Sequence, residues 1–292
     1  MPPQNPKKKP VSVGAEHAGL ISIGSLEDKL PIILTPLLSS SGIILESCKN
    51  FAYPRELSVE LIDKIKHQLQ KKNIKSVVFD LRIQGWTNTP NLKRSRILSR
   101  SLQDFCDNLR INNSIFLSNG DHFFGNAVGR FSEKMEAREV LGGEGPPDLT
   151  KLALEIGSDY LLMTQKAHQR IEAKKQLRDK IISGEFTSSR PGFAEKTAIP
   201  SRKKGYIHHL ALDKLNALRI NLSLAHPGLG LVLSKKPGDW VAKGDVVANV
   251  YVPEGQRNPI EQRTFQELLV MSHAPPNHQL LMLERLGLNI HS

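Results

Sequence analysis

The chain has 292 residues, of which 39% are hydrophobic and 24% are charged. This length is sufficient for one large domain or two smaller ones, each with its own core. No uninterrupted apolar run approaches the roughly 20 residues needed to cross a bilayer, so we expect a globular protein without a membrane span. The only cysteines are Cys48 and Cys106, which fit neither a disulfide framework nor a zinc site and indicate a reducing, intracellular compartment.

The net charge is strongly positive, because the chain has 40 Lys and Arg residues and only 29 Asp and Glu residues, which gives a formal charge of +11. These cations are spread along the chain, and aromatic residues make up only 5%, so the stacking platforms of a single-strand binder are scarce. We therefore favour a solvated basic surface, with binding of nucleic acid through that surface as the alternative.

The first ten residues, MPPQNPKKKP, combine three prolines with three lysines. This composition is typical of a disordered segment, and it disfavours both the amphipathic helix of a transit peptide and the apolar region of a secretory signal. We predict a disordered basic arm over residues 1–20 and a cytoplasmic location, and we keep mitochondrial import by another route as the alternative.

The next part of the chain alternates between apolar segments of strand length and amphipathic helices. The expected elements are apolar segments at 30–38 and 43–45, a helix at 56–69, a buried strand at 77–83, a helix at 92–109, a strand at 114–117 and a helix at 126–141. This alternation predicts an α/β domain over residues 21–183, with a mixed sheet flanked by helices.

The character of the sequence changes after a long helical stretch, which we expect to be continuous over residues 148–182. Residues 184–200 are rich in Gly, Ser, Thr and Pro and are interpreted as a linker. Residues 201–292 predict a small C-terminal α+β domain, with strands at 205–210, 230–233 and 246–252 and a tail over 261–288 that alternates between loop and helix.

Two pairs of neighbouring residues that contain histidine are candidate sites. His208 and His209 are adjacent in an expected strand, so their side chains should point to opposite faces and cannot share a metal ion. Asp121 and His122 stand at a turn and hint at acid–base chemistry, but no Ser or Cys nucleophile is placed beside them by the sequence. We therefore predict no metal site.

The segment GNAVGRFSEKMEAREVLGGEGPPDLTKL begins at Gly125 and combines spaced glycines, an acidic helix, a Gly-Pro turn and an Asp-Leu pair. In this order it resembles the thymidine and pyrimidine-nucleoside phosphorylases, with Gly125, Gly129, Glu133 and Glu136 in the family's register. Asp148 and Leu149 end the matching stretch.

A second segment, which begins at Lys203, is similar to the C-terminal domain of the same family at Gly205, Gly238, Asp239 and Gly244. Its Gly-Asp turns also occur in biotinyl and lipoyl modules, because tight hairpins need glycine where φ is positive. No lysine stands in the Met-Lys context of such a carrier, so we expect no prosthetic group.

A third segment, ISIGSLEDKLPIILTPLLSSSGI from Ile21, resembles the family's phosphate-binding loop and the helix that follows it. The residues in register, called here the phosphate-loop residues, are Ser22, Gly24, Asp28 and Lys29. The strand at 77–85, with Asp80, resembles a further family strand, and the resemblance implies that Asp80 fixes a loop.

Phosphorolysis needs a site that holds a phosphate dianion, and a glycine-rich turn with a nearby cation is suited to this task. The family's turn reads Lys-His-Ser-Thr-Gly-Gly-x-Gly-Asp-Lys, but this chain has Leu20 and Ile21 in place of the first two residues. Glu27 would also place a carboxylate beside the phosphate, and one like-charge contact at about 4 Å costs roughly 4 kcal/mol at an effective dielectric near 20. We interpret the phosphate-loop residues as structural remnants and name no catalytic residue.

The family's pyrimidine-binding segment has no counterpart either, because the interval between Gly42 and Val77 is too short to contain it. The helical lobe that supports dimerisation in the family is mostly missing, which leaves homodimerisation open and uncovers apolar faces that favour a protein partner or a larger assembly.

Our leading hypothesis is therefore a catalytically degraded phosphorylase homologue, a pseudoenzyme that acts as a structural or interaction subunit and needs no cofactor. One alternative is an active pyrimidine-nucleoside phosphorylase, a pentosyltransferase with phosphate as co-substrate, or an aberrant gene model of such an enzyme. The other alternative is a nucleic-acid-associated accessory protein.

Overall fold

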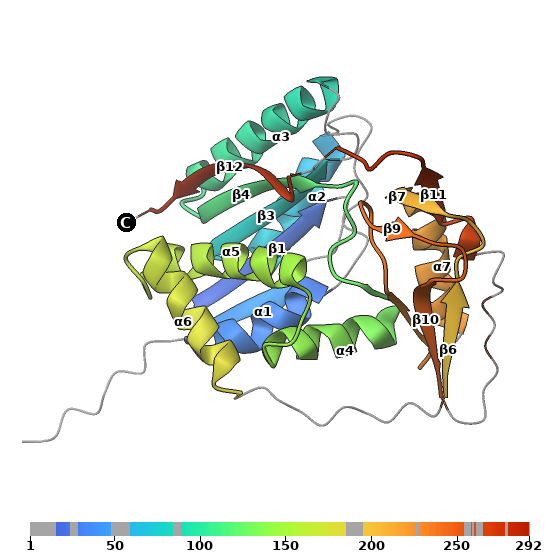
Figure 1. Ribbon diagram of the computed structural model, residues 1–292. Coiled ribbons are helices and arrows are strands. Elements are labelled where there is room, and N and C mark those ends of the chain that lie inside the picture. The colour runs from blue at the N-terminus through green and yellow to red at the C-terminus, as the bar shows by residue number, and fades with distance from the viewer. Residues whose placement is uncertain are drawn as a thin grey trace, which may run out of the picture.

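The computed structural model is an α/β structure in which a five-stranded sheet carries helices on both faces and a smaller β-rich lobe lies beside it (Figure 1). The predicted fold class is confirmed. The residues that the structure describes are 16–23, 29–47, 59–83, 89–184, 195–225, 228–253, 258, 260, 265–277 and 280–291.

The large sheet has the strand order β12-β4-β3-β1-β2, in which the last four strands are parallel and β12 is antiparallel to β4. Its strands are β1 (Glu16–Ile23), β2 (Ile43–Ser47), β3 (Ser76–Ile83), β4 (Asn112–Asn119) and β12 (Met282–Asn289). Every residue of β3 is buried, as expected for a parallel strand that is covered on both faces. The order in which the chain adds strands switches sides between β1 and β3, since β2 lies on one side of β1 and β3 on the other. Crevices at such switch points commonly hold ligands in α/β proteins.

Six helices cover the two faces. They are α1 (Lys29–Ser39), α4 (Arg130–Leu141), α5 (Pro147–Met163) and α6 (Arg170–Ile182) on one face, and α2 (Val59–Lys71) and α3 (Thr89–Asn108) on the other. The first group shares a core with Leu20, Val78 and Phe116 of the sheet, whereas the second group packs against the alternate side chains of the same strands. The domain is therefore a three-layer α/β/α arrangement.

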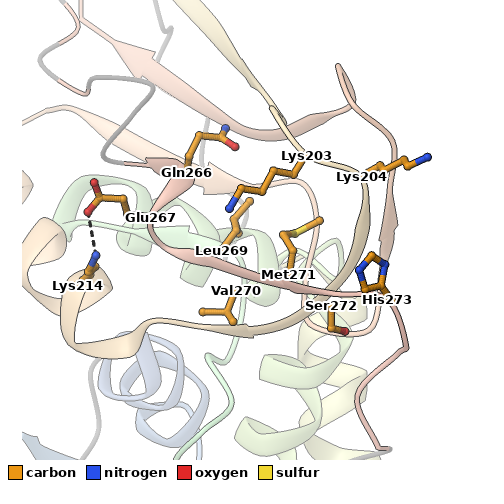
Figure 2. A pocket seen from close by; sticks show the side chains of 10 residues that line it. All are labelled: Lys203, Lys204, Lys214, Gln266, Glu267, Leu269, Val270, Met271, Ser272 and His273. Carbon is orange, nitrogen blue, oxygen red and sulfur yellow. Dashed lines mark hydrogen bonds and ion pairs between the residues drawn. The ribbon is translucent and has the colours of Figure 1, made fainter.

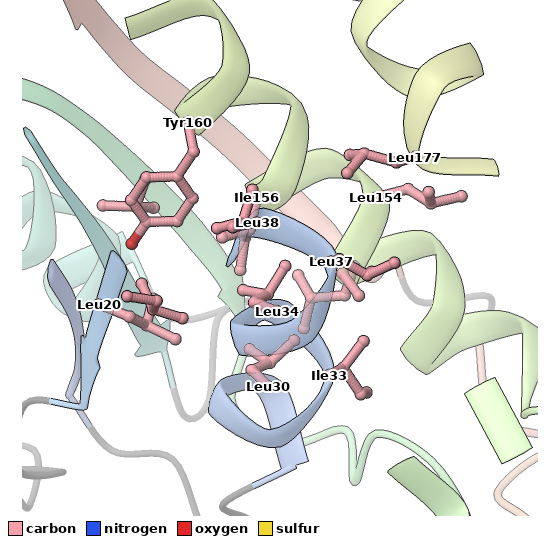
Figure 3. Packing of buried hydrophobic residues seen from close by; sticks show 14 of the residues in the cluster. Leu20, Leu30, Ile33, Leu34, Leu37, Leu38, Leu154, Ile156, Tyr160 and Leu177 are labelled. Carbon is pink, nitrogen blue, oxygen red and sulfur yellow. The ribbon is translucent and has the colours of Figure 1, made fainter. Parts of the chain in front are cut away.

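Helix α1 lies at the centre of the larger core, between the sheet and α5 (Figure 3). Its residues Leu30, Leu34 and Leu37 are at most 2% exposed and recur at helical spacing. Tyr160 of α5 adds a polar anchor, since its hydroxyl donates a hydrogen bond of 2.5 Å to the carbonyl oxygen of Gly19 in β1. This packing fixes the position at which β1 ends and α1 begins.

The smaller lobe contains a four-stranded sheet of order β5-β8-β10-β6 and a three-stranded sheet of order β11-β7-β9. Its strands are β5 (Ala127–Val128), β6 (Glu195–Pro200), β7 (Gly205–Leu210), β8 (Gly230–Leu233), β9 (Trp240–Val241), β10 (Val246–Val252) and β11 (Leu269–Ser272). Helix α7 (Leu212–Ala225) contributes Leu215 and Leu222 to the core of this lobe.

Two strands cross between the parts that the sequence predicted as separate domains. Strand β5 follows the large sheet in the chain but pairs with β8, and β12 returns from the C-terminal part to pair with β4. The prediction that residues 201–292 form one separate domain is therefore wrong for Met282–Asn289. Its leucines pack on the large sheet, where the predicted loop and helix are replaced by a strand.

Three other boundaries differ from the predictions. Glu16–Ile23 forms the central strand β1, so the predicted basic arm cannot extend to residue 20, and residues 1–15 lie outside the described part. Glu195–Pro200 is strand β6 and not linker, because it pairs with β10 along its length. Residues 148–182 form two helices, since the chain turns between them and Gln165 has a φ of 56°.

Candidate functional site

The candidate site lies at the carboxyl edge of the large sheet, where β1, β3 and β4 end. Ser22 stands opposite Asp80 in the register of β1 and β3 and is 4% exposed. Of the remaining phosphate-loop residues, Gly24 and Asp28 lie outside the described residues, as does Glu27, and Lys29 is the first residue of α1. The described part of this edge is a strand end and a helix start.

Lys29 is buried at this edge and its ammonium group is held by two partners. Its Nζ atom lies 2.7 Å from Oε2 of Glu136, donates a hydrogen bond of 2.8 Å to the carbonyl oxygen of Phe124, and sits 4.4 Å from the ring centroid of Phe123. The side chain of Lys29 is 0% exposed and that of Glu136 is 4% exposed. The pair therefore forms a closed contact between α1 and α4.

The other oxygen of Glu136 holds the chain that leads into α4. Oε1 accepts hydrogen bonds from the backbone N–H groups of Asn126 and Ala127, at 2.6 and 3.0 Å. Gly125 has a φ of 72°, and a Cβ atom there would lie 2.2 Å from Glu136 Oε2 and 2.8 Å from Lys29 Nζ. Only glycine fits this position, so the glycine in the matching sequence stretch serves the Lys29–Glu136 pair.

Asp80 and Arg82 form a second buried pair on β3. Arg82 Nε donates a hydrogen bond of 2.6 Å to Asp80 Oδ2, and the hydroxyl of Ser118 on β4 donates one of 2.6 Å to Asp80 Oδ1. The guanidinium group of Arg82 lies 4.3 Å from the centroid of the Phe124 ring. Asp80 thus joins β3 to β4 and orients an arginine beneath the segment that also binds Lys29.

Asp148 lies at the start of α5, and three donors contact its Oδ2 atom. Its Oδ2 atom lies 2.8 Å from His122 Nε2 and 2.5 Å from Lys236 Nζ, and it accepts a hydrogen bond of 3.2 Å from the N–H of Gly125. Burial acts to raise the pKa of Asp148, but the hydrogen bond from His122 and the charge of Lys236 outweigh burial and hold this pKa well below its usual range. Lys236 belongs to the smaller lobe, so the contact ties the two lobes together.

Glu133 provides a second tie between the lobes. It accepts two hydrogen bonds from Arg219 of α7, at 2.6 and 2.9 Å, and a third of 3.2 Å from the N–H of Gly129, which caps α4. The bidentate geometry is the favourable form of an arginine–carboxylate pair. Glu133 therefore holds α4 against α7.

The matching glycines of the smaller lobe lie at a strand start and in turns. Gly205 begins β7, and Gly238 and Gly244 flank β9 on either side. Asp239 Oδ2 accepts a hydrogen bond of 2.8 Å from the N–H of Lys236, which closes the turn before β9. The Asp239 turn therefore positions Lys236, the residue that contacts Asp148.

His208 and His209 do not point to opposite faces, so that prediction is wrong. The register of β7 against β11 slips at this point, since His209 faces Val270 while Ile207 faces Met271. Both imidazoles are exposed, their Nδ1 atoms lie 3.1 Å apart, and they line a hollow of about 410 Å³ with Asp121 and Asp213. Among the described residues no group of three His, Cys, Asp or Glu side chains is arranged to hold a metal ion.

Comparison with known proteins gives a consistent set of relatives. The chain is 24% identical over 249 residues to the pyrimidine-nucleoside phosphorylase of Staphylococcus epidermidis, an alignment that covers 74% of this chain and 58% of that enzyme. It is 22% identical to the enzymes of the same name from Geobacillus stearothermophilus (73% of this chain, 55% of the relative) and Staphylococcus aureus (68% and 52%). No protein-family profile matches the chain.

The chain is thus similar in sequence to pyrimidine-nucleoside phosphorylases over 68–74% of its own length. The alignments span only 52–58% of the length of these phosphorylases. None of the described helices has the length and apolar character that crossing a bilayer requires.

The sequence resemblance to the phosphorylases pointed to both Lys29 and Glu136, but to only one member of each other contact. Glu133 was singled out without its partner Arg219, and Asp148 without its partner Lys236. Lys236 and Arg219 come from the smaller lobe, and no local sequence pattern connects them to the large sheet. Within the Asp148–Lys236 pair, only Asp148 carried a sequence signal, because it falls in the family's register after the Gly-Pro turn.

Proposed function

We propose that this chain is a phosphorylase-fold protein that has lost phosphorolysis and acts as a structural or interaction subunit. The observation that carries the proposal is the state of Lys29, whose ammonium group is fully buried and bound by Glu136 and by the carbonyl of Phe124. To bind phosphate, this lysine would first have to leave its partners, and breaking a buried ion pair costs about 3–5 kcal/mol. Lys29 is therefore a structural cation.

The neighbouring residues support the same conclusion. Leu20 and Ile21 stand where the resemblance places a lysine and a histidine, and both are at most 1% exposed within the cores on the two faces of the sheet. Aliphatic side chains offer a phosphate oxygen neither a charge nor a hydrogen bond. The other cations of this edge, Arg82, Arg219 and Lys236, each contact a carboxylate. A fold that has lost phosphorolysis can still bind other proteins, and this role needs no cofactor.

The direct test is phosphate-dependent release of uracil from uridine and of thymine from thymidine by the purified chain. The enzyme from Geobacillus stearothermophilus, assayed in parallel, controls for the substrates and the detection. We expect no release by this chain, and no heat on titration with inorganic phosphate or with thymine. Release that depends on phosphate would overturn the proposal and favour an active pentosyltransferase.

A Glu27→Gly variant separates two reasons for the loss. Glu27 would repel phosphate whatever the state of Lys29, so its removal tests the loop sequence alone. We expect the variant to remain unable to bind phosphate, because Lys29 stays paired with Glu136. Phosphate binding restored by this one substitution would contradict the argument from Lys29.

A further inference from the structure

An open hollow of about 700 Å³ follows strand β11 in the smaller lobe (Figure 2). Leu269 and Met271 project toward the side on which Lys203 lies, whereas Val270 and Ser272 project to the other side of the strand. Lys204 and His273 line the hollow at the end of β11, the side chain of Lys203 extends toward Leu269, and Lys214 of α7 lines the hollow near the start of the strand (Figure 2). An apolar strand thus runs among basic side chains.

Strand β11 is an edge strand with an unprotected sequence. It pairs with β7 on one side, and no strand of the described residues pairs with its other side. Proteins usually protect such edges with charged residues, prolines or very short strands. β11 reads Leu-Val-Met-Ser and carries no charged residue and no proline, although it has only four residues and its register against β7 shifts between Val270 and Met271.

The other edge strands of the three sheets differ from β11 in this respect. β2 carries Glu46, β12 carries Glu284 and Arg285, and β6 carries Lys196 and a proline, while β5 and β9 are only two residues long. Among the described strands, β11 is therefore the edge that remains open to pairing with another chain.

The charge of the side chains around the hollow indicates which kind of partner segment could pair with β11. Lys203 and Lys204 form no ion pair with a described residue, so both ammonium groups are available to a ligand. Lys214 contacts Glu267 at 2.8 Å, but both side chains are at least half exposed, and such a pair is weak. The surface around β11 is consequently cationic with an apolar floor, and it is complementary to acidic residues that alternate with apolar ones.

We propose that β11 binds an extended segment of a partner protein in which acidic and apolar residues alternate, and that this segment adds to the sheet as a fourth strand. Its backbone pairs with the open edge, its apolar side chains contact the half-buried Met271, and its carboxylates contact Lys203 and Lys204. The inference rests on the proposed function, because it names the partner surface of a non-catalytic subunit.

The same surface is less suited to nucleic acid. The residues that line the hollow include no Phe, Tyr or Trp on which bases could stack. Nucleic acid also has no peptide backbone that could pair with the open strand edge. A peptide uses the edge, the apolar floor and the lysines together.

The experiment measures binding of a fluorescent peptide of alternating glutamate and valine, about eight residues long to match a strand, to the full chain by anisotropy. We expect binding that the double variant Lys203→Glu/Lys204→Glu weakens by about tenfold or more. The matched control is Lys151→Glu/Lys243→Glu, which makes the same change in net charge at two exposed lysines outside the hollow and should change affinity less than about twofold. Thermal unfolding of each variant verifies that it is folded.

Two N-methylated peptides test the pairing of the backbones. One carries methyl groups on the glutamate amides and the other on the valine amides, so each loses the donors along one of its edges but keeps all side chains. Since only one edge can face β11, one of the two peptides should lose binding. Equal binding of both would show that no strand is added and would overturn the proposal.

Further outcomes would overturn it as well. These are a dissociation constant above about 1 mM for the unmodified peptide, equal weakening by the control variant, or binding of an oligouridylate that depends on Lys203 and Lys204 and is not displaced by the peptide. The phosphorolysis assay on the same preparations keeps the two proposals apart. Absence of both activities rejects this surface only, whereas phosphorolysis rejects the proposed function.

Discussion

The carboxyl edge of the large sheet and the hollow along β11 both contain basic side chains, but in opposite states. At the sheet edge, Lys29 and Arg82 are buried against carboxylates, whereas Lys203 and Lys204 of the hollow face solvent without an ion-pair partner among the described residues. A buried pair fixes the packing of the elements that carry it, because separation of the two charges leaves one of them uncompensated. An exposed lysine contributes little to folding and is available for binding. Positive charge alone therefore does not reveal where this protein binds an anion.

The largest effect that this comparison predicts is at Lys29. Lys29→Met should lower the free energy of unfolding by about 3–5 kcal/mol, because the carboxylate of Glu136 is then buried without its cation. Urea unfolding followed by circular dichroism measures the loss. The double variant Lys29→Met/Glu136→Gln should recover part of it, since the neutral amide oxygen still accepts from the N–H groups of Asn126 and Ala127. A single variant within about 1 kcal/mol of the wild type would remove the distinction between the two regions.

The second-largest loss of stability is expected at the Asp148 contact between the lobes. Asp148→Asn should cost about 1–3 kcal/mol at neutral pH, because His122 and Lys236 lose a charged partner. The pKa of Asp148 is depressed in the folded state, so its stabilisation is fully present above the ordinary pKa near 4 and is lost as the pH falls through the folded value. The stability difference between wild type and variant, measured in urea, should be constant from about pH 7 to pH 5 and shrink below about pH 4. A difference that grows in acid would reverse the assignment.

A smaller effect is expected where β12 is attached to α5. Arg285 lies 2.8 Å from Glu155 and 3.3 Å from Asp159, and its guanidinium group is 4.6 Å from the Phe116 ring centroid. Arg285→Leu should cost about 1–2 kcal/mol, and protection of the β12 amides from hydrogen exchange should fall.

Arg96→Leu provides the matched control for Arg285. Arg96 contacts Glu284 of the same strand, but its side chain is 49% exposed, so the substitution should cost less than about 1 kcal/mol. Equal losses for Arg96 and Arg285 would mean that burial does not determine the value of these pairs.

The smallest effect is expected in the hollow. Lys203→Glu/Lys204→Glu should change the free energy of unfolding by less than about 0.5 kcal/mol, because both side chains are exposed and neither forms an ion pair with a described residue. Urea unfolding of this variant beside Lys29→Met gives the comparison directly. A loss as large as that of Lys29→Met would show that the lysines of the hollow support the fold.

Local sequence patterns were sufficient for the elements whose environment is uniform along their length. The β-branched and aromatic run from Val77 to Ile83 predicted a buried strand, and β3 is buried on both faces. The register of glycines and acids from Gly125 predicted the approach to α4 and its acidic face. In both cases neighbouring residues carry enough information, because side-chain period and turn chemistry are local properties.

Predictions failed where an element depends on a distant partner. Glu16 to Gly19 read as part of a polar arm, yet they lie in the middle of the sheet because β2 and β3 pair with them on either side. The C-terminal tail read as loop and helix, but β4 provides the edge on which Met282–Asn289 becomes a strand. Strand pairing is a long-range choice, and one strand does not contain the sequence of its neighbours.

The sequence by itself determined the α/β class, the likeness to the pyrimidine-nucleoside phosphorylases and the altered residues around Ser22. Only the tertiary structure decided what the remaining charges do. It brings Glu136 against Lys29 and Lys236 against Asp148, and it leaves Lys203 beside an open strand. The physical reason is that charge is a property of a residue, whereas burial and pairing are properties of the packed chain.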